Sequence, residues 1–222
     1  MRLYTELVAE LKRIAERVPG APIANSLGME DMLLVHAAAS EGLNLSVLVL
    51  ETGRLHEATL ALLDTAMKRY GTLTWDVRSP DTQALSNIIQ SDGINGFRHS
   101  VAARKACCNA RKVLPLNQAL AAHAGWITGQ RREQSKTREA LALHEVDGQG
   151  RDKFNPLAQW TLKDVRAAVE ALGVPINPLH AQHYPSIGCE PCTRAISAGE
   201  DVRAGRWWWE QPESKECGLH PL

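Results

Sequence analysis

The chain has 222 residues, 44% of them hydrophobic, which is enough to bury one sizeable core. Its 25 basic and 25 acidic residues give no formal net charge at pH 7. This balance excludes a protein that binds nucleic acid or a membrane surface through one dominant charge, so any anion site must be local.

The first predicted element is an amphipathic helix. Leu7, Leu11, Ile14 and Val18 form its apolar stripe, and the Pro-Gly pair at 19–20 ends it. Its other faces carry charged side chains at helical spacing, which a signal peptide or a membrane span would not tolerate. We therefore expect a cytoplasmic protein.

Predicted strands and helices alternate along most of the remaining chain. Short apolar runs of strand length are followed by turns and then by helical segments. The predicted strands cover 21–25, 45–50, 73–77, 126–129 and 141–146, and the predicted helices include 56–70 and 161–172. This alternation predicts an α/β fold with a parallel-rich central sheet and helices on both faces.

Two turns follow predicted strands at the edge where parallel sheets bind ligands. One runs from Ser26 through Gly28 to Asp31 and opens a helix, whose unpaired amides and positive dipole can hold an anion. The other contains Thr52 and Gly53. The acidic residues at 30 and 31 equally suit the first turn of a helix without a ligand, and they would oppose a phosphate placed against them.

The sequence has five cysteines, which we expect to stay reduced in the cytosol. Cys107 and Cys108 are adjacent, and Cys189 and Cys192 form a Cys-x-x-Cys pair, so four thiolates can bind zinc or an iron-sulfur cluster. Neighbouring side chains on a helix diverge by about 100 degrees, which fits the separate irons of a cubane better than one zinc ion. On spacing alone a cluster, zinc, thiol chemistry and no metal all remain open.

The stretch from Gly188 to His220 holds the remaining cysteine, Cys217, close to the carboxyl end. Nearby positive charge and good access favour a nucleophilic thiolate there, although a terminal cysteine can be fortuitous. The three tryptophans at 207–209 either anchor this stretch against the domain or contact a partner.

Basic side chains recur near the turns and the cysteines. The cysteine pair is flanked by Lys105, Arg111 and Lys112, and the fourth predicted strand is followed by Arg131, Arg132 and Arg138. Surface solvation is the ordinary explanation for any one of them. Their recurrence at predicted ligand-facing ends favours a shared anion pocket. The two arginines at 203 and 206 would share a face if that segment were helical.

In order along the chain, the segments SLGMED, ETGRLHEAT, CCNARK, TGQRREQS, KFNPL, GCEPCTR, GRWWWE and KECGLH resemble the assimilatory adenylylsulfate (APS) reductases, relatives of the phosphoadenylylsulfate (PAPS) reductases. The resemblance covers nearly the whole chain. It implies an adenine nucleotide α-hydrolase-like fold with a C-terminal catalytic tail. It also implies a [4Fe-4S] cluster on Cys107, Cys108, Cys189 and Cys192.

By the same resemblance, Cys217 is the nucleophile that attacks the sulfur of bound APS, so that AMP leaves and an S-sulfocysteine remains. Thioredoxin, or a glutaredoxin-like dithiol, then releases sulfite, as sulfate assimilation for cysteine biosynthesis requires. The residues that match the phosphosulfate-binding set are Lys112, Arg138, Arg203 and Arg206. Those that match the adenosine side are Leu50, Thr52, Gly53 and Gly129, and Ser26 and Gly28 lie in the modified pyrophosphatase loop.

From its length and composition we expect one domain with a functional C-terminal extension. Residues 1–187 would form a nucleotide-binding α/β domain with the first half of the cluster site. Residues 188–222 would carry the second half of the cluster site and Cys217. A homo-oligomer is one of the open alternatives. The alternatives are a PAPS or dual APS/PAPS reductase, a four-cysteine zinc protein that only binds nucleotide, and an ATP-dependent adenylating enzyme that uses the turn at Ser26.

Overall fold

The structure, a computed structural model, describes residues 2–135 and 138–211. Contacts group the chain into two compact units that interleave in sequence. The first unit comprises Met1–Val49, Glu57–Asp76 and Ala122–Pro178, and the second comprises Leu50–His56, Val77–Ala121 and Leu179–Leu222. The predicted boundary between residues 187 and 188 falls inside the second unit.

The strands form a six-stranded sheet with the order β3-β2-β1-β4-β6-β5. Their bounds are β1 (Pro22–Asn25), β2 (Ser46–Leu50), β3 (Thr74–Arg78), β4 (Gly125–Thr128), β5 (His144–Val146) and β6 (Asp152–Phe154). β1 is parallel to β2 and β4, and β4 is parallel to β6, whereas β5 pairs antiparallel with β6. The predicted α/β class with a parallel-rich sheet is confirmed.

β6 is a strand that the sequence pattern did not predict. Asp152–Phe154 has one apolar side chain in three residues, too short a run to show a period. The strand forms because Gly125 opposes it on β4, where an added Cβ would lie 2.8 Å from the Asp152 carbonyl oxygen. Lys153 can be buried there because its ammonium pairs with Glu145 at 2.7 Å.

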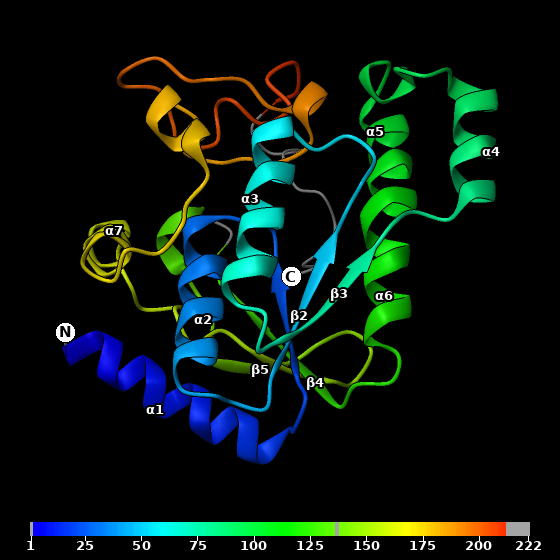
Figure 1. The fold of residues 1–222 in the computed structure, drawn as a ribbon. Helices are drawn as coiled ribbons and strands as arrows, with labels where there is room; N and C mark the ends of the chain where they lie inside the picture. Colours follow the sequence, from blue (N-terminus) through cyan, green and yellow to red (C-terminus); the bar gives the residue numbers. More distant parts are fainter. Residues whose placement is uncertain (1, 136–137, 212–222) are drawn as a thin grey trace. The chain divides into compact units, whose positions relative to one another are not determined.

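The first unit has four helices among its described residues, α1 (Arg2–Arg17), α2 (Met29–Ser40), α3 (Glu57–Arg69) and α7 (Leu162–Ala171) (Figure 1). The predicted stripe of α1 is confirmed, since Leu7, Leu11 and Ile14 are buried in the apolar core. α2 contacts both α1 and α7, which explains why it is apolar on nearly every side. A short 3-10 turn, η3 (Arg132–Gln134), follows β4.

The second unit contains a helical run in which α5 (Val101–Cys108) passes through a π-helical turn, η2 (Asn109–Val113), into α6 (Leu114–Leu120) (Figure 1). Pro115 has no amide hydrogen to donate to the Arg111 carbonyl, so the ordinary ladder of hydrogen bonds cannot continue through this point. Such π turns are frequent at functional sites, and this one directly follows Cys107 and Cys108.

The rest of the second unit packs around that run. α4 (Thr82–Asp92) and the 3-10 turn η1 (Gly96–Arg98) contact α5. Two further 3-10 turns are η5 (Pro178–Gln182) and η6 (Glu190–Cys192). This unit has its own apolar cluster, in which Phe97 and Trp207 pack with the cysteines. No helix among the described residues is long and apolar enough to cross a membrane.

Candidate functional site

The predicted anion turn of the first unit is held by one of its own carboxylates. β1 ends at Asn25, and Gly28 precedes α2 without a side-chain cap. The Asp31 carboxylate accepts hydrogen bonds from the Ser26 amide at 2.7 Å and the Ser26 hydroxyl at 2.6 Å. The Leu27 amide donates to Asn25 at 2.6 Å. The turn therefore already contains an anion, and these donors are engaged within the chain.

Asp31 is unusual because it is almost completely buried, with 8% of its surface exposed. Burial raises the pKa of its carboxyl to about 6, and the neighbouring charge of Glu30 adds to this increase. The hydrogen bonds from Ser26 and Gly129 act in the opposite direction and favour the carboxylate. The turn thus changes its charge close to neutral pH.

The end of β4 lies directly against this turn. A Cβ on Gly129 would lie 2.2 Å from an Asp31 carboxylate oxygen and 3.0 Å from its amide nitrogen. The buried Arg131 donates to Glu30 at 2.8 Å, and Gln134 donates to the same oxygen at 3.1 Å. Arg138 in turn donates to Gln134. The first unit therefore brings together four of the predicted substrate residues, Ser26, Gly28, Gly129 and Arg138.

In the second unit, the turn after β2 lies beside a cysteine. Thr52 is buried, and its hydroxyl lies 3.4 Å from the Cys189 sulfur, while its carbonyl accepts a hydrogen bond from Arg111 at 2.5 Å. Gly53 has a φ of +68°, a conformation that favours glycine. A Cβ there would lie 3.3 Å from the Arg111 guanidinium, so this turn packs closely on η2. The predicted residue Leu50 ends β2 immediately before this turn.

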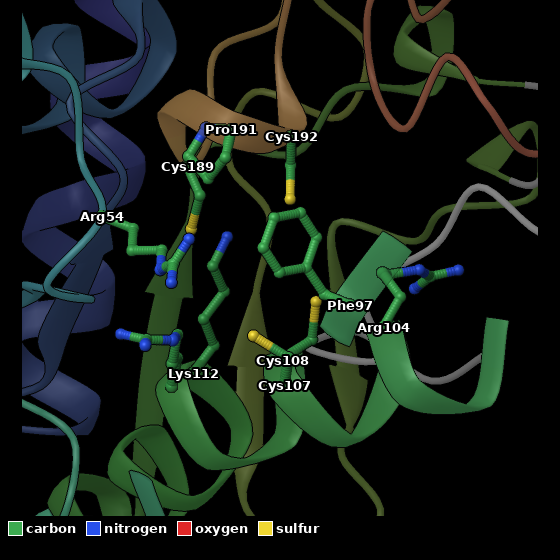
Figure 2. Close-up of a pocket in the computed structure, with 10 residues that line it drawn as sticks. Arg54, Phe97, Arg104, Cys107, Cys108, Lys112, Cys189, Pro191 and Cys192 are labelled. Carbon is green, nitrogen blue, oxygen red and sulfur yellow. The ribbon is translucent and has the colours of Figure 1, made fainter. Parts of the chain in front are cut away.

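The four predicted cluster cysteines line one pocket of the second unit (Figure 2). Cys107 and Cys108 end α5, whereas Cys189 precedes η6 and Cys192 ends it. Figure 2 shows the Cys189 and Cys192 side chains pointing from η6 toward the helix that carries the other pair. All four are free thiols. The structure thus brings together two pairs that lie 81 residues apart, counted from Cys108 to Cys189.

Cations surround these sulfurs. Lys112 and three arginines, Arg54, Arg104 and Arg111, also line the pocket. Burial opposes ionisation of Cys189, but Lys112, a hydrogen bond with Thr52 and nearby arginines outweigh it and lower the pKa of this thiol. Burial and the charges of the other cysteines raise the pKa of Cys192 to about 12.

The donor set, four cysteine thiols in one pocket, fits an iron-sulfur cluster. The space among the lining side chains, open solvent included, is about 300 Å³. In addition, the indole nitrogens of Trp207 and Trp209, which pack against the cysteines, are buried donors without a described partner. Soft thiolates and unused donors suit a group with sulfide acceptors.

Arg203 lies in a turn and Arg206 forms an isolated antiparallel bridge with Thr193, so the conditional prediction of a shared helix face does not apply. The Arg206 side chain is buried and donates to Ser186 at 3.4 Å and to the Ile187 carbonyl at 3.3 Å. A Cβ on Gly188 would lie 2.4 Å from its guanidinium, so a larger residue at 188 would have to displace the Arg206 side chain. The Arg203 amide donates to Asp201 at 2.8 Å.

Sequence reasoning missed the buried charges around the cysteines. Arg104 is fully buried and Glu210 nearly so, although the spacing of Arg104 from Cys107 and Cys108 already placed all three on one helix face. Nothing in the sequence pattern indicates that Glu210 is the buried partner of Arg104. Cys217 lies outside the described residues, so its predicted role stays a prediction.

The family model described as phosphoadenosine phosphosulfate reductase domain matches residues 21–195. A protein of Burkholderia cepacia named adenosine 5'-phosphosulfate reductase is 52% identical over 217 residues, which cover 96% of this chain and 86% of the relative. A protein of the same name from Allochromatium vinosum is 48% identical over 211 residues, covering 95% and 82%.

Solved structures share the fold. The phosphoadenylyl-sulfate reductase of Candida auris, in a phosphate complex, gives a TM-score of 0.71 at 20% identity, covering 85% of this chain and 90% of that one. The NH3-dependent NAD synthetase of Campylobacter jejuni gives 0.56 at 14% identity, covering 78% and 73%. These likenesses confirm the predicted adenine nucleotide α-hydrolase-like fold.

Asp31→Asn tests the buried carboxyl through pH. The pKa of Asp31 is about 6 in the folded chain and 3.8 ordinarily, so the folded chain binds this proton more tightly than the unfolded chain does. The protonated carboxyl therefore adds to the free energy of unfolding at low pH, and this contribution is lost as pH rises from about 4 to about 6. The loss is on the order of 3 kcal/mol. Urea unfolding at several pH values should show Asp31→Asn gaining stability relative to the wild type over this range. A difference that does not vary with pH would contradict the assignment.

Gly129→Ala tests the packing of β4 on the turn. The new Cβ must displace the Asp31 side chain and backbone, so we expect a loss of about 1–3 kcal/mol in the free energy of unfolding. The matched control is Gly148→Ala, because Gly148 is exposed and has no atom within 4 Å of an added Cβ. The control should change stability by less than about 0.5 kcal/mol. Equal effects of the two changes in urea unfolding would argue against the packing role.

Proposed function

The chain belongs to the phosphoadenosine phosphosulfate reductase family, and we propose that it reduces adenosine 5'-phosphosulfate (APS) to sulfite and AMP. The proposal rests mainly on one observation, the four free cysteines that line a pocket together with Lys112. Relatives 44–52% identical over nearly the whole chain carry the name adenosine 5'-phosphosulfate reductase, which supports APS as the substrate.

The proposed reaction transfers a sulfonate to Cys217. Its thiolate attacks the sulfur of APS, a sulfur–sulfur bond forms, and the bond from that sulfur to the phosphate oxygen breaks. AMP leaves with the electron pair. A dithiol such as thioredoxin then attacks the Cys217 sulfur, sulfite leaves with the bonding pair, and the second thiol of the dithiol completes a disulfide. The dithiol is oxidised, and Cys217 returns to its thiolate.

The cations of the site have a clear task in this reaction. An anionic thiolate must approach a substrate that is itself negative at both its phosphate and its sulfonate. Positioned cations offset this repulsion and stabilise the charge that develops on the leaving phosphate. Lys112 and Arg206 suit this role in the second unit, since Lys112 lines the pocket and the charges of both favour the thiolate of Cys189. We assign Arg203 and Arg138 to the same set.

We assign binding of the nucleotide to turns that contain glycine. We assign Gly53 and Gly129 to the nucleotide side, together with Leu50, which ends β2, and Thr52, which directly precedes Gly53. The side chain and carbonyl of Thr52 already contact Cys189 and Arg111. Ser26 and Gly28 belong to the turn of the first unit. In this turn the Ser26 amide and hydroxyl already donate to the Asp31 carboxylate. A phosphate there must compete with that carboxylate.

Cys107, Cys108, Cys189 and Cys192 would hold a [4Fe-4S] cluster. When bound, the cluster supplies a fixed local charge to the pocket, while the electrons for reduction come from the dithiol. The chain's own part is to keep Lys112 close to the cysteines, because the π turn η2 carries this residue four positions after Cys108. We also propose a cytoplasmic location, because a reducing compartment keeps cysteines available as thiolate ligands.

Mixing the enzyme with APS in the absence of reductant tests the transfer step. Intact-mass and peptide analysis should find one sulfonate on Cys217 and an equal amount of AMP, and Cys217→Ser should form neither. Replacing APS with PAPS distinguishes a strict APS reductase from a dual enzyme. Release of AMP without a sulfonate on Cys217 would rule out the proposed intermediate.

Anaerobic purification tests the cluster. The wild type should contain iron and acid-labile sulfide, and Cys192→Ser should lose most of both, because the pocket then lacks one thiolate. Cys217→Ser is the matched control and should keep its iron, since Cys217 is outside the four-cysteine set. A colourless protein that contains zinc and no sulfide would favour the nucleotide-binding zinc protein instead.

A further inference from the structure

A buried ion pair adjoins one of the four pocket cysteines. Arg104 lies on α5 one turn before Cys108, and its side chain has no exposed surface. Its Nε and Nη2 donate to the two carboxylate oxygens of Glu210 at 2.9 and 2.8 Å, and the Glu210 side chain is only 3% exposed. Two parallel hydrogen bonds of this kind fix the orientation of a guanidinium as well as its distance from the carboxylate.

The second partner of Arg104 is Cys108 itself. Both side chains line the cysteine pocket, and Figure 2 shows them on the same helix. Burial opposes the charge of Arg104, but hydrogen bonds with Glu210 and Cys108, together with the charges of the carboxylate and the thiolate, outweigh it and raise the pKa of the guanidinium. Arginine has five N–H groups, so the two that bind Glu210 leave others for the sulfur. Glu210, Arg104 and Cys108 thus form a buried series of three groups.

Trp207 shields this series from water. Its ring centre lies 4.6 Å from the Arg104 guanidinium, and only 1% of its surface is exposed. Its amide donates to the Cys192 carbonyl at 3.1 Å, and its carbonyl accepts a hydrogen bond from the Glu210 amide at 2.8 Å. Where water is excluded, a hydrogen bond is electrostatically stronger than in water. The charge of Arg104 therefore acts on Cys108 with little screening.

Stability alone does not explain why a buried ion pair stands at this place. Two buried charges lose about as much solvation as they gain in attraction, and apolar side chains of the same volume usually stabilise a protein equally well or better. What the pair does provide is a positive charge that a carboxylate and a sulfur share. The fraction of this charge that acts on Cys108 depends on Glu210, because the carboxylate offsets part of it.

We propose that Arg104 is a positioning residue for the iron-sulfur cluster, which orients the Cys108 thiolate through a charge-assisted hydrogen bond, and that Glu210 sets the strength of this bond. The inference rests on the proposed cluster. A hydrogen bond to a ligating sulfur withdraws electron density from the bond between sulfur and iron, and it also raises the reduction potential of a cluster. Loss of Arg104 and loss of the Glu210 charge should therefore have opposite effects on the cluster.

The test uses the anaerobically purified, iron-loaded enzyme and two variants. The double variant Arg104→Met, Glu210→Leu removes the donor to Cys108 and replaces the pair by apolar side chains, so that no buried charge is left unpaired. Glu210→Gln keeps Arg104 and an acceptor oxygen for it, but it removes the charge of the carboxylate. Glu200→Gln is the matched control, because it removes a carboxylate that pairs with Arg194 in the same unit and is one-third exposed.

Resonance Raman spectra of the oxidised cluster should show opposite shifts of the iron–cysteine stretching bands. In the double variant the frequency should rise, because Cys108 has lost its donor. In Glu210→Gln it should fall, because the full charge of Arg104 then acts on Cys108. The reduction potential of the cluster should fall in the double variant and rise in Glu210→Gln. Glu200→Gln should match the wild type in both measurements.

The outcomes separate this inference from the proposed cluster. A wild type without iron and sulfide defeats the cluster itself. A wild type that contains the cluster, with no shift in the variants or with shifts of the same sign in both, means that the pair only shapes the pocket, and this result overturns the role of Arg104. If the double variant loses its iron, the sign of the shift in Glu210→Gln decides alone, and a rise in its stretching frequency contradicts the inference.

Discussion

The cysteine pocket depends on a short main-chain pairing between two segments that are far apart in sequence. Leu55 pairs with Cys189, and the Glu190 amide donates to the Arg54 carbonyl at 2.8 Å. The same contact places the Thr52 hydroxyl on the Cys189 sulfur. Backbone hydrogen bonds are insensitive to side-chain identity, so they fix the position of η6 and leave the side chains free for chemistry. The η6 cysteines face α5 because of this pairing.

The sequence predicted the sheet and the cysteine set because both depend on local patterns. Strand runs and Cys-x-x-Cys spacing are visible within a few residues, as β2 and the pair at 189 and 192 show. β6 and the burial of Arg104 could not be predicted in this way. The strand lies against Gly125, which leaves room for its backbone, and the buried arginine pairs with Glu210, which is 106 residues away. Strand β6 and the burial of Arg104 depend on tertiary contacts, which a local pattern does not show.

The turn at Ser26 shows a second limit of pattern reading. Acidic residues in the first turn of α2 are expected from the helix dipole alone. The structure gives Asp31 a more specific task, because its carboxylate binds both donors of Ser26 and contacts the end of β4. Burial holds the pKa of this group at about 6, so a small change in its surroundings changes its charge. A ligand that approaches the turn therefore also alters a proton equilibrium.

The three consecutive tryptophans differ in burial, and two of them show the anchoring role that the sequence left open. Trp207 is sandwiched between two arginines with 1% of its surface exposed, and Trp209 packs on Phe97 at 6.0 Å. Both therefore anchor the segment to the pocket. Trp208 has 38% of its surface exposed, and its ring meets Trp209 edge-on at 4.7 Å. Of the three, Trp208 is the one with an exposed ring, and its two neighbours hold its segment against the pocket.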